Sequence, residues 1–329
     1  MDDAALSASS LRLVILIPVR DDWTPAAELL RRLDRAMAST PHAAQVLLVD
    51  DGSMQDYRTA DLPSHFAALR GLRILRLRRN LGHQRAIAAD LTHIEGAMPC
   101  DAVLVMDGDG EDTPEGALQL LREFTGKAAL FARRTRRTES LSFRLSYRAY
   151  KALYRGLTGM RVQVGNFSIL PASYLRTLAT MPEMWNHYVA AVKRSRLPFA
   201  VTPIPRGRRI AGQSKMNFLA LMVHGLSSIA VFGDVVGARM IVVSLTAALL
   251  ASGCLCAAAA LRFLAHWAVP GWIGWTAAAL LMVFLQCAAV AAAFTLTILS
   301  QRSHQVFLPQ RDCAAMIEGF EDIVRCDRP

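Results

Sequence analysis

Two long stretches without a formally charged side chain constrain this chain more than any other feature. Residues 240–261 contain no charged residue, and residues 263–301 contain none that is formally charged. A helix needs about 20 residues to cross the hydrocarbon core of a bilayer, and buried core helices rarely run so far without a charge. The sequence therefore predicts two transmembrane helices, at about 240–262 and 274–299, which form a hairpin over residues 239–301.

The distribution of basic residues predicts the orientation of this hairpin. The net charge of +10 is concentrated in the first two-thirds of the chain, and the link between the spans carries Arg262, His266 and three tryptophans. Cytoplasmic segments are enriched in Lys and Arg, and Trp is typical of the bilayer interface. We therefore expect residues 1–215 and the tail 302–329 to be cytosolic. Residues 1–10 lack the basic region of a signal peptide.

Basic residues also precede the hairpin in two runs. Between 131 and 161 there are nine Arg or Lys and one acid, and between 193 and 215 there are seven and no acid. Each such residue near an anionic leaflet contributes about 1 kcal/mol of attraction. Residues 216–238 are moderately apolar and predict amphipathic juxtamembrane helices at the interface, with His224 as an interface residue. Membrane lipids are thus expected partners.

The first two hundred residues alternate between strand and helix patterns. Amphipathic segments of helical length, including 25–37 and 82–94, separate five apolar runs. Such alternation predicts an α/β domain of Rossmann-like type with a mostly parallel sheet. The predicted strands are residues 11–18, 45–53, 72–77, 102–107 and 128–134.

Acidic residues follow three of these strands. The stretch VLVMDGDGEDTPE (103–115) ends its apolar run in alternating Asp and Gly, and acids also follow the first two strands, at 21–22 and 50–51. Right-handed crossovers place these strand ends on one rim, where open α/β sheets bind ligands. Oxygen ligands two residues apart, at Asp107 and Asp109, suit Mg²⁺ or Mn²⁺ bridging to a diphosphate. Asp-Gly repeats also form simple turns, so this motif alone leaves both interpretations open.

Several other kinds of site are excluded. With Asp107 as its first position, an EF-hand would need Gly at Asp112 and Glu at Leu118. No Gly-rich loop ending in Gly-Lys-Ser/Thr is present, and the six cysteines have no zinc or disulfide spacing.

Six motifs, in order, resemble those of inverting family 2 glycosyltransferases with the GT-A fold. They are IPVRDD, VDDGS, RNLGHQRAIA, MDGDGEDTPE, GNFSILP and RIAGQSK, and the similarity spans residues 11–218. Within the family, the chain is most similar to polyprenyl-phosphate glycosyltransferases of the dolichol-phosphate mannose synthase type, in their bacterial membrane-anchored form.

The resemblance implies roles for individual residues. Nucleotide binding is implied for Pro18, Arg20, Asp22, Asp51, Gly82 and Asp107. Catalysis is implied for Asp107, Asp109, Asp112, Arg209 and Lys215, with the metal held by Asp107 and Asp109. Acceptor or phosphate binding is implied for Asn166, Ser168, Arg209, Ser214 and Lys215.

The implied reaction is transfer of a sugar from a UDP- or GDP-linked donor to polyprenyl (undecaprenyl) phosphate. It would be metal-dependent and inverting, on the cytoplasmic leaflet of the bacterial inner membrane. The resemblance implies no nucleic-acid partner and permits a homo-oligomer. A processive polysaccharide synthase fits poorly, because the chain has few spans and no Gln-x-x-Arg-Trp motif.

The sequence departs from the family pattern at four positions. Arg20 and Asp21 stand in place of Tyr and Asn, and Asn166 and Ser168 in place of Asp and Arg. Loss of that Asp would remove a general base, but a phosphate monoester with a second pKa near 6 is already dianionic at neutral pH. Two alternatives remain open: a catalytically degenerate membrane scaffold, and a glycosyltransferase with a hydroxyl acceptor.

The predicted topology can be tested by cysteine labelling from outside intact cells. A cysteine introduced at Pro270, between the spans, should react with an impermeant reagent, whereas one at Gln310 should not. The opposite labelling pattern would reverse the topology.

Overall fold

The computed structural model describes residues 10–59, 61–134, 141–161, 164–212, 218–264, 272–303 and 306–325. The chain divides into two compact units. The first contains residues 1–148, 162–231 and 306–329, and the second contains residues 149–161 and 232–305.

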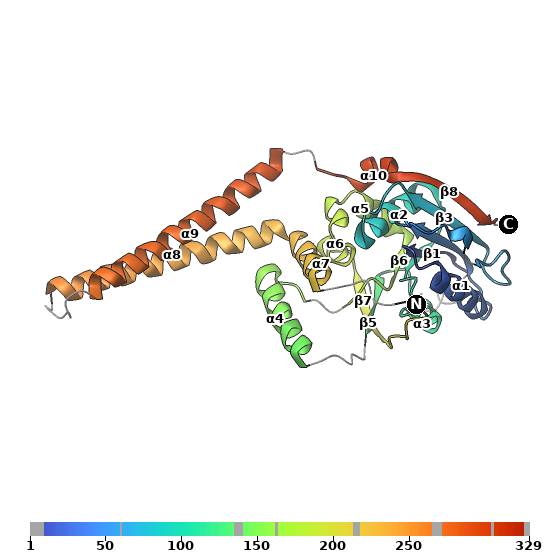
Figure 1. The fold of residues 1–329 in the computed structure, drawn as a ribbon, viewed down its shortest axis with the longest axis horizontal. Helices are drawn as coiled ribbons and strands as arrows, with labels where there is room; N and C mark the ends of the chain where they lie inside the picture. The colour runs from blue at the N-terminus through green and yellow to red at the C-terminus, as the bar shows by residue number, and fades with distance from the viewer. Residues whose placement is uncertain are drawn as a thin grey trace, which may run out of the picture. The chain divides into compact units, whose positions relative to one another are not determined.

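An eight-stranded sheet forms the centre of the first unit, in the order β7-β5-β6-β4-β1-β2-β3-β8 (Figure 1). The central pairs β4-β1, β1-β2 and β2-β3 are parallel, as is β5-β7, whereas β6 and β8 run antiparallel to their neighbours. The predicted α/β class with a mostly parallel sheet is therefore confirmed. The strands are β1 Arg12–Val19, β2 Ala43–Asp50, β3 Gly71–Leu77, β4 Ala102–Val105, β5 Ala129–Arg134, β6 Ser168–Pro171, β7 Phe199–Ile204 and β8 Ile317–Val324.

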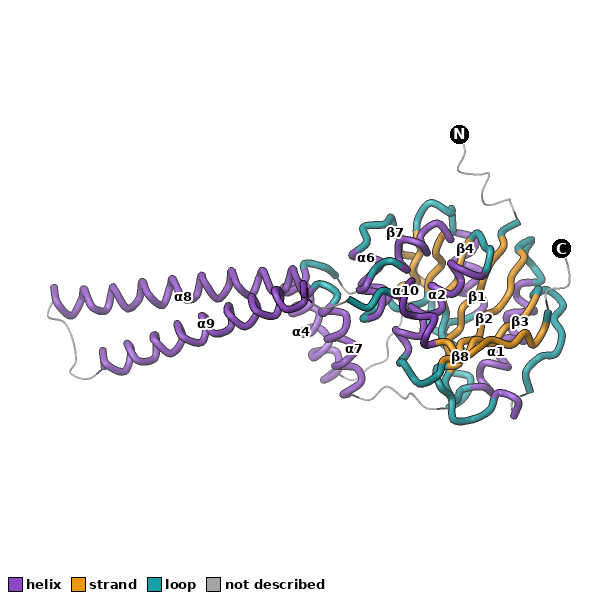
Figure 2. Tube along the Cα trace, turned by 90° about the horizontal axis from the view of Figure 1, so that it is seen from above, coloured by secondary structure: helices purple, strands orange, loops and turns teal. Residues whose placement is uncertain are grey.

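Helices cover both faces of this sheet (Figure 2). Helices α1 (Trp23–Met37) and α3 (Pro114–Glu123) pack on one face, and α2 (His83–Ala97), α5 (Leu175–Ala179) and α6 (Tyr188–Arg194) pack on the other. In β1, Leu13 and Ile15 face the first layer while Val14 and Leu16 face the second. A strand buried on both faces has to be apolar throughout, which explains the uninterrupted run at 13–17.

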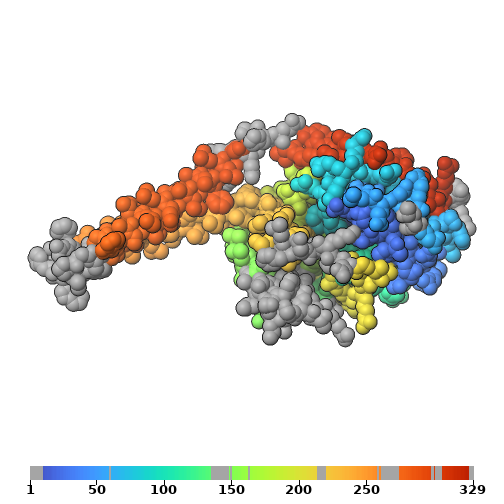
Figure 3. Space-filling view, in the orientation of Figure 1, coloured from blue at the N-terminus to red at the C-terminus, as the bar shows by residue number. Residues whose placement is uncertain are grey.

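The carboxyl-terminal residues belong to the sheet, which differs from the expectation of a separate tail at 302–329. After the short helix α10 (Pro309–Asp312), β8 pairs with β3, and Figure 3 shows this red segment beside the blue and cyan amino-terminal ones. Arg73 binds Asp322 at 2.6 Å across the pair. Sequence patterns missed β8 because an edge strand exposed on one side, with three acids among eight residues, is weakly apolar.

Two long helices dominate the second unit. Helix α8 spans Gly233–Leu264, α9 spans Trp272–Ser303, and the two pack against each other. Within them, Gly233–Ala257 and Gly274–Thr297 are long and apolar enough to cross a membrane. Arg239 at the start of α8 donates to the Gly156 carbonyl of helix α4 (Leu141–Thr158) at 2.7 Å.

The predicted juxtamembrane stretch 216–238 contains one complete helix and the start of another. Helix α7 spans Phe218–Ala230, and α8 begins at Gly233. Leu221, Met222, Val223 and Leu226 of α7 are exposed. Such a side of a helix suits an interface between water and lipid.

One buried carboxyl group in α2 was not predicted from the sequence. Asp90 is fully buried, and neither of its oxygens has a hydrogen-bond partner among the described residues. Burial raises the pKa of Asp90 well above its usual value. The folded protein therefore holds a proton that the unfolded chain releases above about pH 4, so stability should fall as pH rises from there toward the folded pKa.

We expect Asp90→Asn to raise the stability of the protein at pH 8 by about 1–3 kcal/mol, because the amide is neutral in both states and does not have to take up a proton on folding. The gain should shrink as the pH is lowered toward 4. Thermal unfolding of both proteins across this range measures the difference. A gain that is independent of pH would contradict the assignment.

Candidate active site at the carboxyl edge of the sheet

The carboxyl ends of β1, β2 and β4 meet at one edge of the sheet. Val19 pairs with Asp50 and Leu16 with Val105, so the acidic residues after these strands converge as the sequence predicted. The loops are tied together there. Asp21, at a positive φ of 55°, accepts from the backbone N–H of Met54 at 2.7 Å.

The turn between β4 and α3 is held by its own side chains. Asp107 donates its backbone N–H to Asp112 Oδ2 at 3.0 Å, and Glu111 donates its own to Asp109 Oδ1 at 2.9 Å. Thr113 caps α3 by accepting from Gly116 N–H at 3.1 Å. Carboxylates that accept backbone N–H groups fix the turn and leave few oxygens for other ligands.

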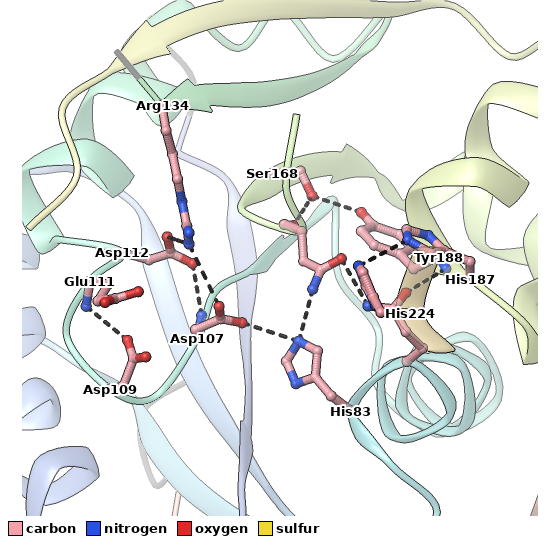
Figure 4. A network of polar contacts seen from close by, with 12 residues as sticks. His83, Asp107, Asp109, Glu111, Asp112, Arg134, Ser168, His187, Tyr188 and His224 are labelled. Atoms are coloured by element: carbon pink, nitrogen blue, oxygen red, sulfur yellow. Dashed lines mark hydrogen bonds and ion pairs between the residues drawn. The ribbon is translucent and has the colours of Figure 1, made fainter. Parts of the chain in front are cut away.

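Arg134, the last residue of β5, compensates the charge of this turn. Its Nη2 lies 3.4 Å from Asp112 Oδ1 and 3.8 Å from Asp107 Oδ2 (Figure 4). Burial and the charge of Asp107 raise the pKa of Asp112 to about 7. Asp112 is only 3% exposed, so the predicted catalytic residue is placed beneath the surface, where it supports Asp107 and Arg134.

His83 approaches Asp107 from α2. Its Nε2 lies 3.2 Å from Asp107 Oδ1, an ion-pair distance if the imidazole is protonated. Burial raises the pKa of Asp107, but the neighbouring His83 and Arg134 lower it by more, so the net shift is downward. Asp107 in turn raises the pKa of His83, against the effect of burial. The carboxylate of Asp107 is therefore held in its ionised form.

The predicted acceptor residues Asn166 and Ser168 lie in an internal hydrogen-bond network. Asn166 contacts His83 Nε2 at 2.8 Å and accepts from Gln84 at 3.2 Å. The hydroxyl of Ser168 is fully buried, 2.7 Å from the Tyr188 hydroxyl and donating to the Asn166 carbonyl. The expectation that Ser168 contacts the acceptor is therefore corrected: its hydroxyl faces the core because β6 alternates and Ser168 points inward.

The 205–212 loop lies against the acidic turn. Arg209 Nη2 donates to Asp109 Oδ2 at 2.6 Å, and Arg206 forms an ion pair with Glu111. Backbone N–H groups of Gly207 and Ile210 donate to carbonyl oxygens of the turn, at 2.8 and 2.9 Å. In this state Arg209 is bound to a carboxylate of the site itself, rather than open to a phosphate.

The remaining predicted nucleotide-binding residues also lie at this edge. Asp51 accepts from the backbone N–H groups of Leu81 and Gly82, at 2.6 and 3.0 Å, and so fixes the turn before α2. Pro18 is buried near the end of β1, and Arg20 and Asp22 follow that strand. Ser214 and Lys215 lie outside the described residues.

The donor set fits a divalent cation held by few protein ligands. Asp107 Oδ1 is a buried oxygen to which no donor of the described residues is aligned, and hard oxygens are the ligands that Mg²⁺ and Mn²⁺ prefer. In the described part of the chain, no three His, Cys, Asp or Glu side chains form a metal cluster. A cation here would need phosphate and water oxygens, and it would compete with Arg209 for Asp109.

Sequence reasoning missed His83, Gln84, Arg134 and Arg206. His83 and Gln84 follow Gly82 directly in RNLGHQ. The signal that could have identified them as site residues is this position, at the start of a helix beside the acidic strand ends. The two arginines lay within basic runs assigned to the membrane surface. Only the tertiary structure shows which of those basic residues pair with the acidic turn.

His224, predicted as an interface residue, lies 3.3 Å from His187 through their Nε2 atoms. Burial, with a smaller effect of His224, lowers the pKa of His187 to about 3, and burial also lowers the pKa of His224. Both rings are therefore neutral near pH 7, and α7 joins α6 through them.

Gly110 provides a test of how the 205–212 loop is held. Gly110 has a φ of 85°, and a Cβ there would lie 2.4 Å from Ile210 Cγ1. We expect Gly110→Ala to displace the loop and to accelerate tryptic cleavage after Arg208 severalfold. Gly96→Ala, at a helical position with nothing within 4 Å, is the control and should leave the rate unchanged. Equal cleavage of both variants would contradict this account.

The curated proteins to which this chain is similar include glycosyltransferases. The chain is 27% identical to the uncharacterized glycosyltransferase YkcC of Bacillus subtilis over 226 residues, which cover 66% of this chain and 67% of that protein. It is 26% identical over 220 residues to the undecaprenyl-phosphate 4-deoxy-4-formamido-L-arabinose transferase of Klebsiella pneumoniae, covering 64% of each. The matched region thus spans about two thirds of these relatives.

Solved structures are similar in part. A glucosyl-3-phosphoglycerate synthase from Mycobacterium tuberculosis, in complex with Mn²⁺, UDP-glucose and phosphoglyceric acid, has a TM-score of 0.47 at 14% identity, covering 71% of this chain and 82% of that one. The mannosyl-3-phosphoglycerate synthase of Rubrobacter xylanophilus has a TM-score of 0.45 at 14% identity, covering 67% of this chain and 72% of that one.

The family model for glycosyl transferase family 2 matches residues 14–175, from β1 to the start of α5. Residues 14–175 therefore form a domain that matches glycosyl transferase family 2.

Proposed function

We propose that the protein transfers a sugar from a nucleotide-sugar donor to a polyprenyl phosphate, on the cytoplasmic leaflet of a bacterial inner membrane. The observation that carries the proposal is the acidic edge formed by Asp107, Asp109 and Asp51 within a family 2 domain, on a chain that also has two helices long enough to span a membrane. Relatives named undecaprenyl-phosphate transferases support the acceptor class.

The chemistry needs negative charge to be stabilised as the diphosphate leaves. A divalent cation held by Asp107 and Asp109 would supply this stabilisation when bound. His83 and Arg134 keep the Asp107 carboxylate ionised, and Arg209 can exchange Asp109 for a phosphate oxygen, since its guanidinium forms strong bonds with either. Attack on the anomeric carbon from the face opposite the diphosphate would invert its configuration.

The acceptor in this proposal requires no general base from the protein. Asn166 cannot take up a proton, and both ends of its amide already contact Gln84 and His83. A phosphate monoester is largely dianionic at pH 7, so its oxygen can attack without losing a proton. A lipid phosphate therefore suits this site better than a hydroxyl acceptor does.

The metal assignment predicts that Asp107→Ala and Asp109→Ala each lower transfer to undecaprenyl phosphate by about 100-fold or more, while the protein stays folded. Glu318→Ala removes an exposed carboxylate from β8 and serves as the control. Transfer is measured with radiolabelled nucleotide sugars and Mn²⁺ in proteoliposomes, with thermal unfolding as the check on folding. Full activity of either Asp variant in excess chelator would refute the metal site.

The acceptor assignment predicts that undecaprenol, which lacks the phosphate, accepts no sugar, and that turnover falls as the pH drops below about 6 with the second ionisation of the phosphate. Asn166→Asp should bring no gain of the ~10²-fold size that a restored general base would give. Equal transfer to undecaprenol would favour the hydroxyl-acceptor alternative. If the wild-type protein neither transfers the sugar nor hydrolyses the donor in the presence of metal, the scaffold alternative would be favoured.

A further inference from the structure

One carboxylate of the carboxyl-terminal strand reaches the loop that follows β2. Glu321 of β8 accepts a hydrogen bond from the Tyr57 hydroxyl, and its two oxygens lie 3.0 and 3.3 Å from Arg58 Nη2. Tyr57 and Arg58 begin a short 3₁₀ helix, Tyr57–Thr59, at the far end of the 51–58 loop. A side chain that follows α8 and α9 in the sequence therefore contacts a loop that begins at the acidic edge of the sheet.

The near end of the 51–58 loop is held by two neighbouring turns. Asp21 Oδ1 accepts from the backbone N–H groups of Met54 and Gln55, at 2.7 and 3.0 Å. Gly52 has a φ of 66°, and a Cβ there would lie 2.5 Å from the backbone nitrogen of Asn80. The loop thus passes the turn before α2 at a distance that only glycine allows.

The middle of this loop has little packing of its own. Met54 is 91% exposed, and Gln55 and Asp56 are exposed as well. A segment with few buried side chains opens easily unless contacts at its ends hold it. The conformation of the loop therefore depends on the contacts at its two ends.

Tyr57 connects Glu321 to the exposed middle of the loop. The Tyr57 ring is buried, and its centroid lies 5.8 Å from that of Trp23, whose indole N–H donates to the Gln55 carbonyl at 3.0 Å. Burial and the hydrogen bond to Glu321 raise the pKa of Tyr57 to about 12, so the phenol keeps its proton and donates it. A carboxylate has two acceptor oxygens and no donor, so Glu321 can accept from Tyr57 and Arg58 together.

We propose that Glu321 is a positioning residue for the nucleotide-sugar donor, which holds the 51–58 loop through Tyr57 and Arg58 in the conformation that receives the nucleoside. The part concerning the nucleoside rests on the proposed function. The part concerning the loop does not, because it follows from the contacts alone. The proposal adds β8 to the donor site, although this strand lies outside residues 14–175, which match the family model.

Hydrogen exchange of the full-length protein in detergent, without nucleotide, tests the loop directly. Glu321→Ala should accelerate exchange of the Met54 and Gln55 amides about tenfold, because opening of the loop no longer breaks the contacts with β8. Asp322→Ala is the matched control, since it removes the neighbouring carboxylate, which binds Arg73 of β3 instead of the loop. Equal acceleration in both variants, or none in Glu321→Ala, would refute the positioning role.

Tyr57→Phe tests whether Glu321 acts through the phenol. This variant keeps the ring against Trp23 and removes the hydroxyl, so it should accelerate exchange of the loop about threefold while the protein stays folded. In the Glu321→Ala background the same change should add little, because the partner of the hydroxyl is already missing. Effects that multiply in full would show that the two residues act independently and would overturn this connection.

The consequence for the donor is measured by calorimetric titration with UDP and with GDP in the presence of Mn²⁺. For the nucleotide that the wild-type protein binds, affinity should fall about tenfold in Glu321→Ala and stay unchanged in Asp322→Ala. In proteoliposomes the KM for the nucleotide sugar should rise by the same factor, while kcat stays within about twofold, because Asp107 and Asp109 are untouched. A lower kcat with an unchanged KM, or an equal loss of affinity in the control, would contradict the proposal.

The two parts can fail separately. If the wild-type protein binds neither UDP nor GDP, the donor of the proposed function is refuted, while hydrogen exchange still decides whether Glu321 holds the loop. If Glu321→Ala leaves the loop unchanged, the positioning role is refuted, while the Asp107 and Asp109 variants still decide the proposed function.

Discussion

Four carboxylates within the six residues 107–112 repel one another, and the rest of the site is arranged around this repulsion. In the partly buried turn their interaction is stronger than in water, so each charge needs a nearby cation or a donated hydrogen bond. Arg134 approaches from β5, and Arg206 and Arg209 approach from the 205–212 loop. These arginines come from segments far from the turn in sequence, so the electrostatics of one turn joins β5 and the 205–212 loop to the end of β4.

The same repulsion explains why the site suits a cation and a diphosphate together. In the proposed function, a divalent cation would replace Arg209 at Asp109, and the displaced guanidinium would then pair with phosphate oxygens, so that no charge is left without a partner at either stage. Asp107 differs from its neighbours, because one of its oxygens is buried without a hydrogen bond from the described residues. His83 Nε2 lies 3.2 Å from that oxygen but forms its hydrogen bond with the Asn166 amide instead.

The fold places this chemistry at one edge through regular packing. Parallel strands with right-handed crossovers bring the ends of β1, β2 and β4 together, and the helices on both faces bury every side chain of their apolar runs. The edge strand β8 closes the sheet with residues that follow the two long apolar helices in the sequence. The domain is therefore complete only when the chain returns from α9.

The sequence by itself determined the α/β class, five of the eight strands, the two long apolar helices and the convergence of the acidic strand ends, because these depend on local apolar patterns and on the handedness of crossovers. It did not reveal β8, whose edge position allows three acids among its eight residues, or the short strands β6 and β7. Only the tertiary structure decided which basic residues pair with the acidic turn, that Ser168 is buried, and that His83, Gln84 and Asn166 are joined by hydrogen bonds. Those facts depend on contacts between residues 20 to 104 positions apart, where neither periodicity nor local spacing carries information.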